Sequence, residues 1–258
     1  MDKGSLHLNP DLDLPALADA WQARRKMQVR DVFDAATARE IRRVLMEQTP
    51  WGMILNQGER IATLRDSDVR SLTKEQWAQF GDMIAAGAAT GYQYVYDVYT
   101  LVADYFDPAR PWTPLFHLLE YLNSDEFLDF GRRITGDEKI VWADANPSRF
   151  QPGHFLMRHL DDAIGADRRI AFVLNFTPEW GGDWGGYLQF YDEVANIELA
   201  YKPAFNVMNM FAIPQDHSVG MVAPFARHPR LSIAGWYRGD QPARPIGDRA
   251  VFGGAVAP

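Results

Sequence analysis

The chain contains no cysteine among its 258 residues. Without cysteine the protein cannot form a disulfide, use a thiol nucleophile, or hold zinc, an iron–sulfur cluster or haem through a cysteine thiolate. Any metal that it binds must therefore be held by histidine, aspartate, glutamate or backbone oxygens.

Basic charge and long apolar runs are also scarce. The chain has 26 basic and 34 acidic side chains, a net charge of -8, whereas proteins that coat nucleic acid need clustered Lys and Arg. No stretch approaches the roughly 18 apolar residues of a membrane span. The polar opening MDKGSLHLNPDLDLP lacks the apolar segment of a signal peptide. We therefore expect a cytoplasmic protein that binds neither nucleic acid nor membrane.

The first half of the chain has mostly helical patterns. We expect helices over Pro15–Arg25, after the N-cap Asp34, after the Thr73 and Gln76 capping box, and after Thr113. Trp77, Phe80 and Ile84 should form the buried face of the third of these helices. Alternating tyrosines in GYQYVYDVYT predict a strand.

The second half has a different texture. Short β-branched and aromatic segments, RRIAFVLNF, GGYLQFYD, FNVMNMFAI and RLSIAGWYR, are separated by Gly, Pro and Asp. This pattern predicts an antiparallel sandwich or small barrel. We therefore predict an α+β fold in one domain, residues 1–258. A mainly helical N-terminal layer, residues 1–139, would pack on a cupin-like jelly-roll core, residues 140–258.

Candidate chemistry begins in the segment FLMRHLDD. His159 and Asp161 are two positions apart, so on a strand both side chains project from one face and can meet at one point. His154 is an odd number of positions from His159 and should face the other way. The H-x-D pattern also fits a surface histidine beside a solvated acid, and the pattern alone leaves both interpretations open.

The C-terminal region supplies partners for this pair. His217 begins one strand-like segment and Arg230 begins the next. Two histidines and one carboxylate leave three positions of an octahedral Fe(II) free for a 2-oxo acid and O₂. The remote carboxylate of the oxo acid then needs a cation, and Arg230 shares a strand face with Ser232 and Trp236.

The order of these motifs resembles a known family. H-x-D, a distal histidine and R-x-S followed by tryptophan are similar to the 2-oxoglutarate- and Fe(II)-dependent oxygenases of the prolyl-hydroxylase branch. RFQPGHFLMRHLDD and RRIAFVLNFTPEWGGDWGGYLQFYD are also similar to segments of that family. The nearest in pattern are the hydroxylases of a ribosomal-protein prolyl residue and their bacterial relatives. The resemblance covers roughly residues 140–240.

The resemblance implies a fold, a reaction and a set of site residues. His159, Asp161 and His217 would be the catalytic iron ligands, and Arg230 with Ser232 would hold the C5 carboxylate of 2-oxoglutarate. The fold would be a double-stranded β-helix. The enzyme would be a dioxygenase that uses Fe(II), 2-oxoglutarate and O₂, with ascorbate as a further candidate, and that releases succinate and CO₂ as it hydroxylates a C–H bond.

One position departs from the family pattern. Many relatives have a tyrosine where this chain has Phe150, nine residues before His159, and a phenyl ring cannot donate a hydrogen bond to 2-oxoglutarate. Either Ser232 and a second polar group such as Asn175 compensate, or the oxo acid binds more weakly here.

Three functions remain open from the sequence. The first is hydroxylation of a prolyl residue in a peptide or protein, with aromatic residues such as Tyr92 and Tyr94 as candidate surfaces for the proline ring. The second is hydroxylation of a free amino acid or another small molecule. The third is a cupin-like metal-binding protein or isomerase that does not turn over 2-oxoglutarate. The Arg230-x-Ser232 motif favours the first two over the third.

Overall fold

The computed structural model describes residues 1–58, 60–161 and 166–247. Among the described residues, no helix combines the length and the apolarity that crossing a bilayer requires. The helices are η1 (Lys3–Ser5), α1 (Leu14–Arg24), α2 (Ala35–Glu47), α3 (Asp66–Ser71), α4 (Lys74–Thr90), α5 (Leu101–Phe106), α6 (Pro114–Leu122) and α7 (Asp125–Thr135).

The strands belong to one antiparallel sheet with the order β1-β10-β7-β12-β5-β4-β6-β11-β8-β9, and β2 pairs with β3 and β4 beside it. Their bounds are β1 (Lys26–Arg30), β2 (Gly52–Gln57), β3 (Arg60–Leu64), β4 (Tyr94–Val98), β5 (Trp142–Phe150), β6 (Phe155–His159), β7 (Arg168–Phe176), β8 (Leu188–Tyr191), β9 (Ile197–Tyr201), β10 (Phe205–Ala212), β11 (His217–Val219) and β12 (Arg230–Arg238).

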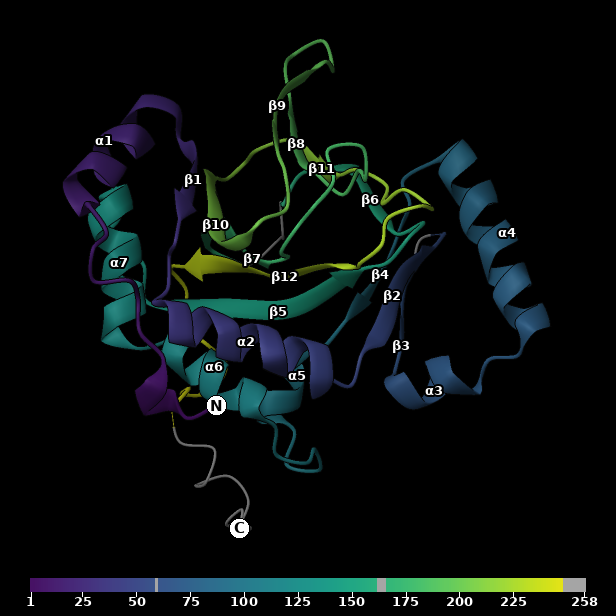
Figure 1. The fold of residues 1–258 in the computed structure, drawn as a ribbon, viewed down its shortest axis with the longest axis horizontal. Helices are drawn as coiled ribbons and strands as arrows, with labels where there is room; N and C mark the ends of the chain where they lie inside the picture. The colour runs from purple at the N-terminus through teal and green to yellow at the C-terminus, as the bar shows by residue number, and fades with distance from the viewer. Residues whose placement is uncertain (59, 162–165, 248–258) are drawn as a thin grey trace.

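The sheet folds into two facing layers (Figure 1). One layer consists of β1, β10, β7, β12 and β5; the other consists of β6, β11, β8 and β9. Strand β4 connects the two layers because it pairs with both β5 and β6. We call the faces that the two layers turn toward each other the inner face. This arrangement confirms the jelly-roll core on which helices pack.

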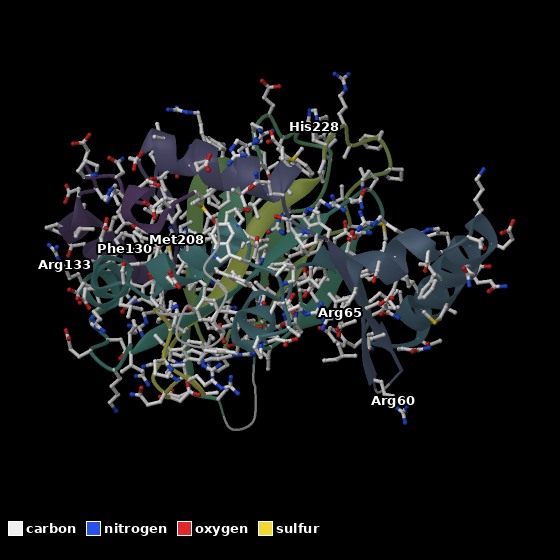
Figure 2. All side chains as sticks on the ribbon, turned by 90° about the horizontal axis from the view of Figure 1, so that it is seen from below. Arg60, Arg65, Phe130, Arg133, Met208 and His228 are labelled. Carbon is white, nitrogen blue, oxygen red and sulfur yellow. The ribbon has the colours of Figure 1, made fainter. Side chains whose placement is uncertain are left out.

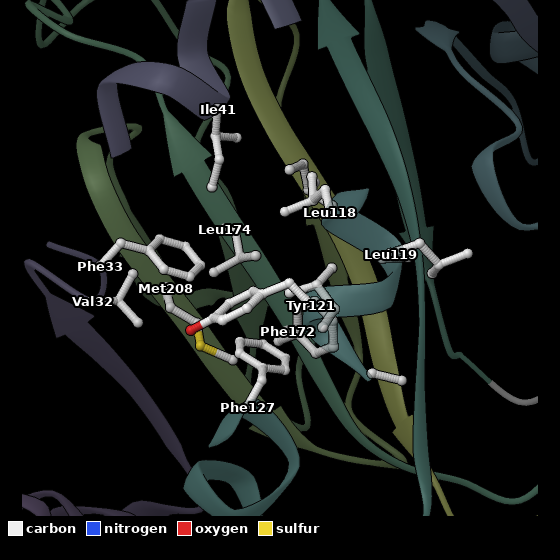
Figure 3. Packing of buried hydrophobic residues seen from close by; sticks show 14 of the residues in the cluster. Val32, Phe33, Ile41, Leu118, Leu119, Tyr121, Phe127, Phe172, Leu174 and Met208 are labelled. Carbon is white, nitrogen blue, oxygen red and sulfur yellow. The ribbon is translucent and has the colours of Figure 1, made fainter. Parts of the chain in front are cut away.

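The main hydrophobic core lies between the helices and the outer face of the first layer (Figure 3). Phe127 of α7 contacts Phe172 of β7 edge-on, with 5.7 Å between ring centroids. Phe33 and Tyr121 extend the same buried cluster toward α2 and α6. On β12 the odd residues, such as Leu231 and Ile233, point into this core, so the even residues turn to the inner face.

Helix starts follow the predicted capping residues. Asp34 accepts hydrogen bonds from the backbone N–H groups of Ala36 and Thr37. Thr73 and Gln76 form the expected capping box. These caps satisfy N–H groups that have no partner inside the first turn of a helix, which is why the helices begin where the sequence predicts.

Residues 1–139 hold the helices that the structure describes, and they also contribute β1, β2, β3 and β4 to the sheet. The strand-like stretch Met27–Val32 and the alternating tyrosines predict β1 and β4, whereas β2 and β3 were not predicted. Strand β1 pairs with β10 along its whole length. The division of the chain at residue 140 therefore does not separate helices from strands.

Helix α4 also differs from its predicted packing. None of its residues is fully buried, and Trp77 is 39% exposed. Phe80 and Ile84 are partly buried against a small cluster on β2 and β4. The helix lies at one end of the molecule beside the β2–β3 ribbon, whose tip carries Arg60 (Figures 1 and 2). It packs on β2 and β4, and its apolar side chains there are only partly buried.

Candidate active site

The structure brings His159, Asp161 and His217 together; we call these residues the His–Asp–His cluster. Their ligand atoms all lie within 4.8 Å of one another. His159 ends β6 and stands directly opposite His217 on β11. The Nε2 atoms of the two histidines lie 3.4 and 3.6 Å from the carboxylate oxygens of Asp161. Two imidazoles and a carboxylate around one point are suited to a divalent metal ion.

Backbone contacts decide which imidazole nitrogens face that point. His159 Nδ1 lies 2.9 Å from the carbonyl oxygen of Met157, and His217 Nδ1 lies 2.8 Å from that of Gln215. If each Nδ1–H donates to its carbonyl, each Nε2 keeps its lone pair for a metal. The cluster therefore offers two nitrogen donors and one oxygen donor that are already oriented.

Burial tunes the charge of the cluster. Burial lowers the pKa of His217, which favours the neutral, ligating form. Burial acts to raise the pKa of Asp161, but the interactions with His159, His217 and Trp236 outweigh it and hold that pKa below its ordinary value. A neutral imidazole beside an ionised carboxylate is the protonation state that metal binding requires.

Trp236 fixes the orientation of the carboxylate. Its indole Nε1–H donates to Asp161 Oδ2 over 3.0 Å. The guanidinium carbon of Arg168 lies 3.9 Å from the centroid of the Trp236 ring, on its face. With Oδ2 engaged by the indole, Oδ1 is the less occupied oxygen for a metal.

Arg230 lies apart from the cluster, buried at the start of β12. The residue is only 2% exposed, yet it forms no ion pair with any carboxylate that the structure describes. Its Nη1 donates to Ser232 Oγ over 3.0 Å, and its Nε has no hydrogen-bond partner among the described residues. Burial lowers the pKa of Arg230 to about 10. A buried cation without an anion is costly, so the surroundings of Arg230 are suited to an anionic ligand.

The other residues predicted to bind 2-oxoglutarate lie beside Arg230. Ser232 is fully buried and shares a hydrogen bond of 2.8 Å with Ser148. Asn175 stands opposite Ser232 in the sheet, but its Nδ2 donates to the carbonyl oxygens of Val173 and Val207. Ser232 therefore positions the guanidinium, while the donors of Asn175 are engaged by the backbone.

A row of aromatic side chains joins the two parts of the site. The ring of Tyr92 lies 6.1 Å from that of His159, and Tyr94 and Tyr96 follow at 5.6 and 6.1 Å between successive centroids. Tyr96 stacks on Phe150, and the Arg230 guanidinium carbon lies 5.0 Å from the Phe150 ring. The His–Asp–His cluster and Arg230 thus face one continuous, aromatic-lined region of the inner face.

Two glycines allow a second segment to approach this region. Gly185 and Gly186 have φ of 65° and 68°, a conformation that favours glycine. A Cβ on Gly185 would lie 2.0 Å from the carbonyl oxygen of Met221, and one on Gly186 would lie 3.5 Å from Cδ of Arg230. The glycine pair therefore brings the chain before β8 against the side chain of Arg230.

The remaining described histidines lie outside the cluster. His154 lines an apolar cavity of about 460 Å³ beneath α4, on the opposite face of β4 from the alternating tyrosines. His228 is exposed on a loop (Figure 2). The position of His154 agrees with the expectation that it faces away from His159.

The inner face of the jelly roll thus carries two histidines and one aspartate around a candidate metal site, together with a buried arginine. Residues 145–238 match the model of the 2OG-Fe(II) oxygenase superfamily. The prolyl 3-hydroxylase OGFOD1 of Mus musculus is 29% identical over 139 residues, which cover 51% of this chain and 25% of that protein. The chain spans about a quarter of the length of the curated relatives that it matches.

Solved structures share the fold. A 2OG-Fe(II) oxygenase family oxidoreductase from Burkholderia pseudomallei superposes with a TM-score of 0.59 at 15% identity, covering 92% of this chain and 97% of that chain. A prolyl hydroxylase from Trichoplax adhaerens, in complex with a hypoxia inducible factor peptide fragment, has a TM-score of 0.56 at 13% identity, covering 88% of this chain and 89% of that chain. The family resemblance and the fold expected from the sequence are confirmed.

Two features of the site were not predicted from the sequence. The sequence predicted that Trp236 shares a strand face with Arg230, but not that it contacts Asp161. It indicated Tyr92 and Tyr94 as candidate surfaces for the substrate, but not Tyr96 as a residue of the site. The period of two in GYQYVYDVYT put all three tyrosines on one face of a strand. That signal could have indicated Tyr96 if the pairing of β4 with β5 and β6 had been known.

Proposed function

We propose that this protein is an Fe(II)- and 2-oxoglutarate-dependent dioxygenase that hydroxylates a prolyl residue in a peptide or protein. When bound, iron with 2-oxoglutarate and O₂ supplies the oxidative decarboxylation to succinate and CO₂ and the insertion of one oxygen atom into a C–H bond. The observation that carries the proposal is the buried, unpaired guanidinium of Arg230 on the same face as the His–Asp–His cluster. A cupin-like metal site would not need this cation.

The protein's own residues would do four things in this reaction. His159, Asp161 and His217 would hold the metal through Nε2, a carboxylate oxygen and Nε2. Arg230, oriented by Ser232, would bind the distal carboxylate of the oxo acid through charge-assisted hydrogen bonds. Trp236 would keep the Asp161 carboxylate in place. The apolar side chains around Phe150 and Trp180 would exclude water from the site.

A prolyl substrate is supported by two findings. The matched curated relatives are prolyl 3-hydroxylases. Beside the cluster, Tyr92 is 45% exposed and Tyr94 packs against it, so their rings offer an apolar surface on which a pyrrolidine ring can pack. We also propose that the protein is cytoplasmic, and cell fractionation tests this location.

The cofactor part is tested by spectroscopy. Addition of Fe(II) and 2-oxoglutarate without O₂ should produce the visible charge-transfer band of a metal-bound 2-oxo acid. Asp161→Ala should abolish the band because it removes a metal ligand. Arg230→Ala should weaken 2-oxoglutarate binding about 100-fold, since it removes charge-assisted hydrogen bonds to a carboxylate. Arg227→Ala, which changes an exposed arginine nearby, is the matched control and should bind as the wild type does.

The outcomes separate the possible functions. If the wild-type protein gives no band and forms no succinate in air, it is not a 2-oxoglutarate oxygenase, and a cupin-like metal protein is the better reading. If Arg230→Ala binds 2-oxoglutarate normally, another group holds the distal carboxylate. Mass spectrometry of proline-containing peptides and free proline should show a gain of one oxygen atom on the peptide, and a gain only on the free amino acid would contradict the peptide substrate.

A further inference from the structure

Two neighbours of Arg230, Phe150 and Asn175, offer no free hydrogen-bond donor to a ligand. Phe150 stands directly opposite Arg230 in the sheet, and its ring lies 5.0 Å from the guanidinium carbon. A phenyl ring offers no hydrogen bond. The Asn175 amide donates to backbone carbonyls. Phe150 and Asn175 therefore supply no donor to the part of the inner face between Arg230 and the His–Asp–His cluster.

Tyr96 lies on the other side of Phe150. Asp97 of β4 pairs with Arg149 of β5, and the same antiparallel register puts Tyr96 beside Phe150. The two rings are stacked, with 4.7 Å between centroids and 11° between planes. Tyr96, Phe150 and Arg230 thus form one row across β4, β5 and β12. A dicarboxylate that extends from Arg230 to the His–Asp–His cluster would pass along this row.

The hydroxyl of Tyr96 is free to bind a ligand there. It has no hydrogen-bond partner among the residues that the structure describes, and the ring is partly buried with Trp180 and Val222 in the same cluster. Burial, followed by the nearby Tyr94 and Tyr92 hydroxyls and the Asp161 carboxylate, raises the pKa of Tyr96 above its ordinary value. The phenol therefore stays protonated, and its ring lies between those of Tyr94 and Phe150 in the row that runs from the cluster side to Arg230.

We propose that Tyr96 donates the hydrogen bond to 2-oxoglutarate that a tyrosine at position 150 would otherwise supply. The inference rests on the proposed function, because it assumes that the oxo acid occupies this face. Tyr96 would then contact the ligand from β4, the strand that pairs with the β5 strand of Phe150. Phe150 is the apolar spacer that holds its ring in place.

The test measures 2-oxoglutarate affinity without turnover. Titration of the charge-transfer band in the anaerobic Fe(II) protein should show that Tyr96→Phe raises the dissociation constant about ten-fold or more, since a hydrogen bond to a charged acceptor is lost. The affinity for Fe(II) alone should not change. Tyr201→Phe, which removes a partly buried hydroxyl on β9, is the control and should leave both affinities unchanged.

A rescue variant separates hydrogen bonding from packing. The double variant Tyr96→Phe with Phe150→Tyr restores a hydroxyl to the same row, and it should recover most of the lost affinity. If Tyr96→Phe does not fold, as judged by thermal unfolding, Tyr96→Leu takes its place in the same titration. A dissociation constant within two-fold of the wild-type value, or a loss that Phe150→Tyr does not reduce, would overturn the role of Tyr96. Absence of the band in the wild-type protein would instead overturn the proposed function.

Discussion

Neighbouring residues decide which nitrogen and oxygen atoms of the His–Asp–His cluster are left to bind a metal. The Nδ1 atoms of His159 and His217 are each within 3 Å of a backbone carbonyl two residues earlier in the chain. The indole of Trp236 engages one oxygen of Asp161. Each contact restricts a ligand that would otherwise rotate, so less conformational freedom is lost when a metal binds.

The hydrogen bond from Trp236 leads to a prediction about metal affinity. Trp236→Phe keeps an aromatic ring beneath Arg168 but removes the Nε1 donor, so the Asp161 carboxylate is held less firmly. We expect Fe(II) affinity to fall roughly ten-fold, the usual effect of losing an outer partner of a ligand. Metal titration by calorimetry under anaerobic conditions measures this. Trp112→Phe, an exposed tryptophan, is the control; equal Fe(II) affinities for Trp236→Phe and the wild type would contradict the prediction.

At the scale of the elements, the inner-face residues depend on how the strands are joined. The pairing of β1 with β10 ends at Val207, and just beyond it β10 shifts register against β7, between Phe205 and Val207. Asn206, with φ of 56°, sits at this shift and is 5% exposed. Its side chain accepts from the backbone N–H of Phe33 and donates to the Phe33 carbonyl. One side chain therefore connects the end of the β1 segment to the sheet.

Removal of this connection should destabilise the protein. Asn206→Ala leaves both backbone groups of Phe33 without their buried partners and puts alanine at a positive φ. We expect the free energy of unfolding to fall by about 3 kcal/mol. Urea denaturation measures the change. Asn196→Ala, at an exposed turn, is the comparison and should cost under about 1 kcal/mol. Similar losses in the two variants would show that the Phe33 contacts contribute little.

At the scale of the whole molecule, residues from both halves build one sheet. Strand β4 pairs with β5 and β6, and β1 pairs with β10. The main core combines α1, α2, α6 and α7 with the outer face of the first layer. The N-terminal region therefore supplies sheet edges, core and the tyrosines of the site, and does more than cover a finished jelly roll.

This arrangement predicts the behaviour of a shortened chain. A fragment that begins at residue 140 would lack β1 and β4 and would expose the apolar face that the helices cover. We expect it to aggregate or to lack a cooperative unfolding transition, because unpaired edges and uncovered apolar surface are unfavourable in water. Circular dichroism during thermal unfolding, with the full chain as the reference, measures this. A sharp transition from the fragment would show that the jelly roll folds without its N-terminal layer.

The sequence predicted most of the local features. Capping residues such as Asp34 and Thr73 mark helix starts because they act on their own first turn. Local periodicity predicted β4, and the spacing of His159 and Asp161 predicted that their side chains share a face. It did not predict β2 and β3 or the half-exposed α4, because these depend on which surface remains uncovered after the sheet is assembled.

The sequence by itself therefore determined the class of fold and the candidate residues, since turn chemistry, strand alternation and the H-x-D and R-x-S motifs act over a few positions. Only the tertiary structure decided that Arg230 is buried without an anion, that Trp236 reaches Asp161, and that Tyr96 stacks on Phe150. Trp236 and Asp161 are 75 positions apart in the sequence, and Tyr96 and Phe150 are 54 positions apart. Such contacts depend on sheet order and register, which local sequence does not encode.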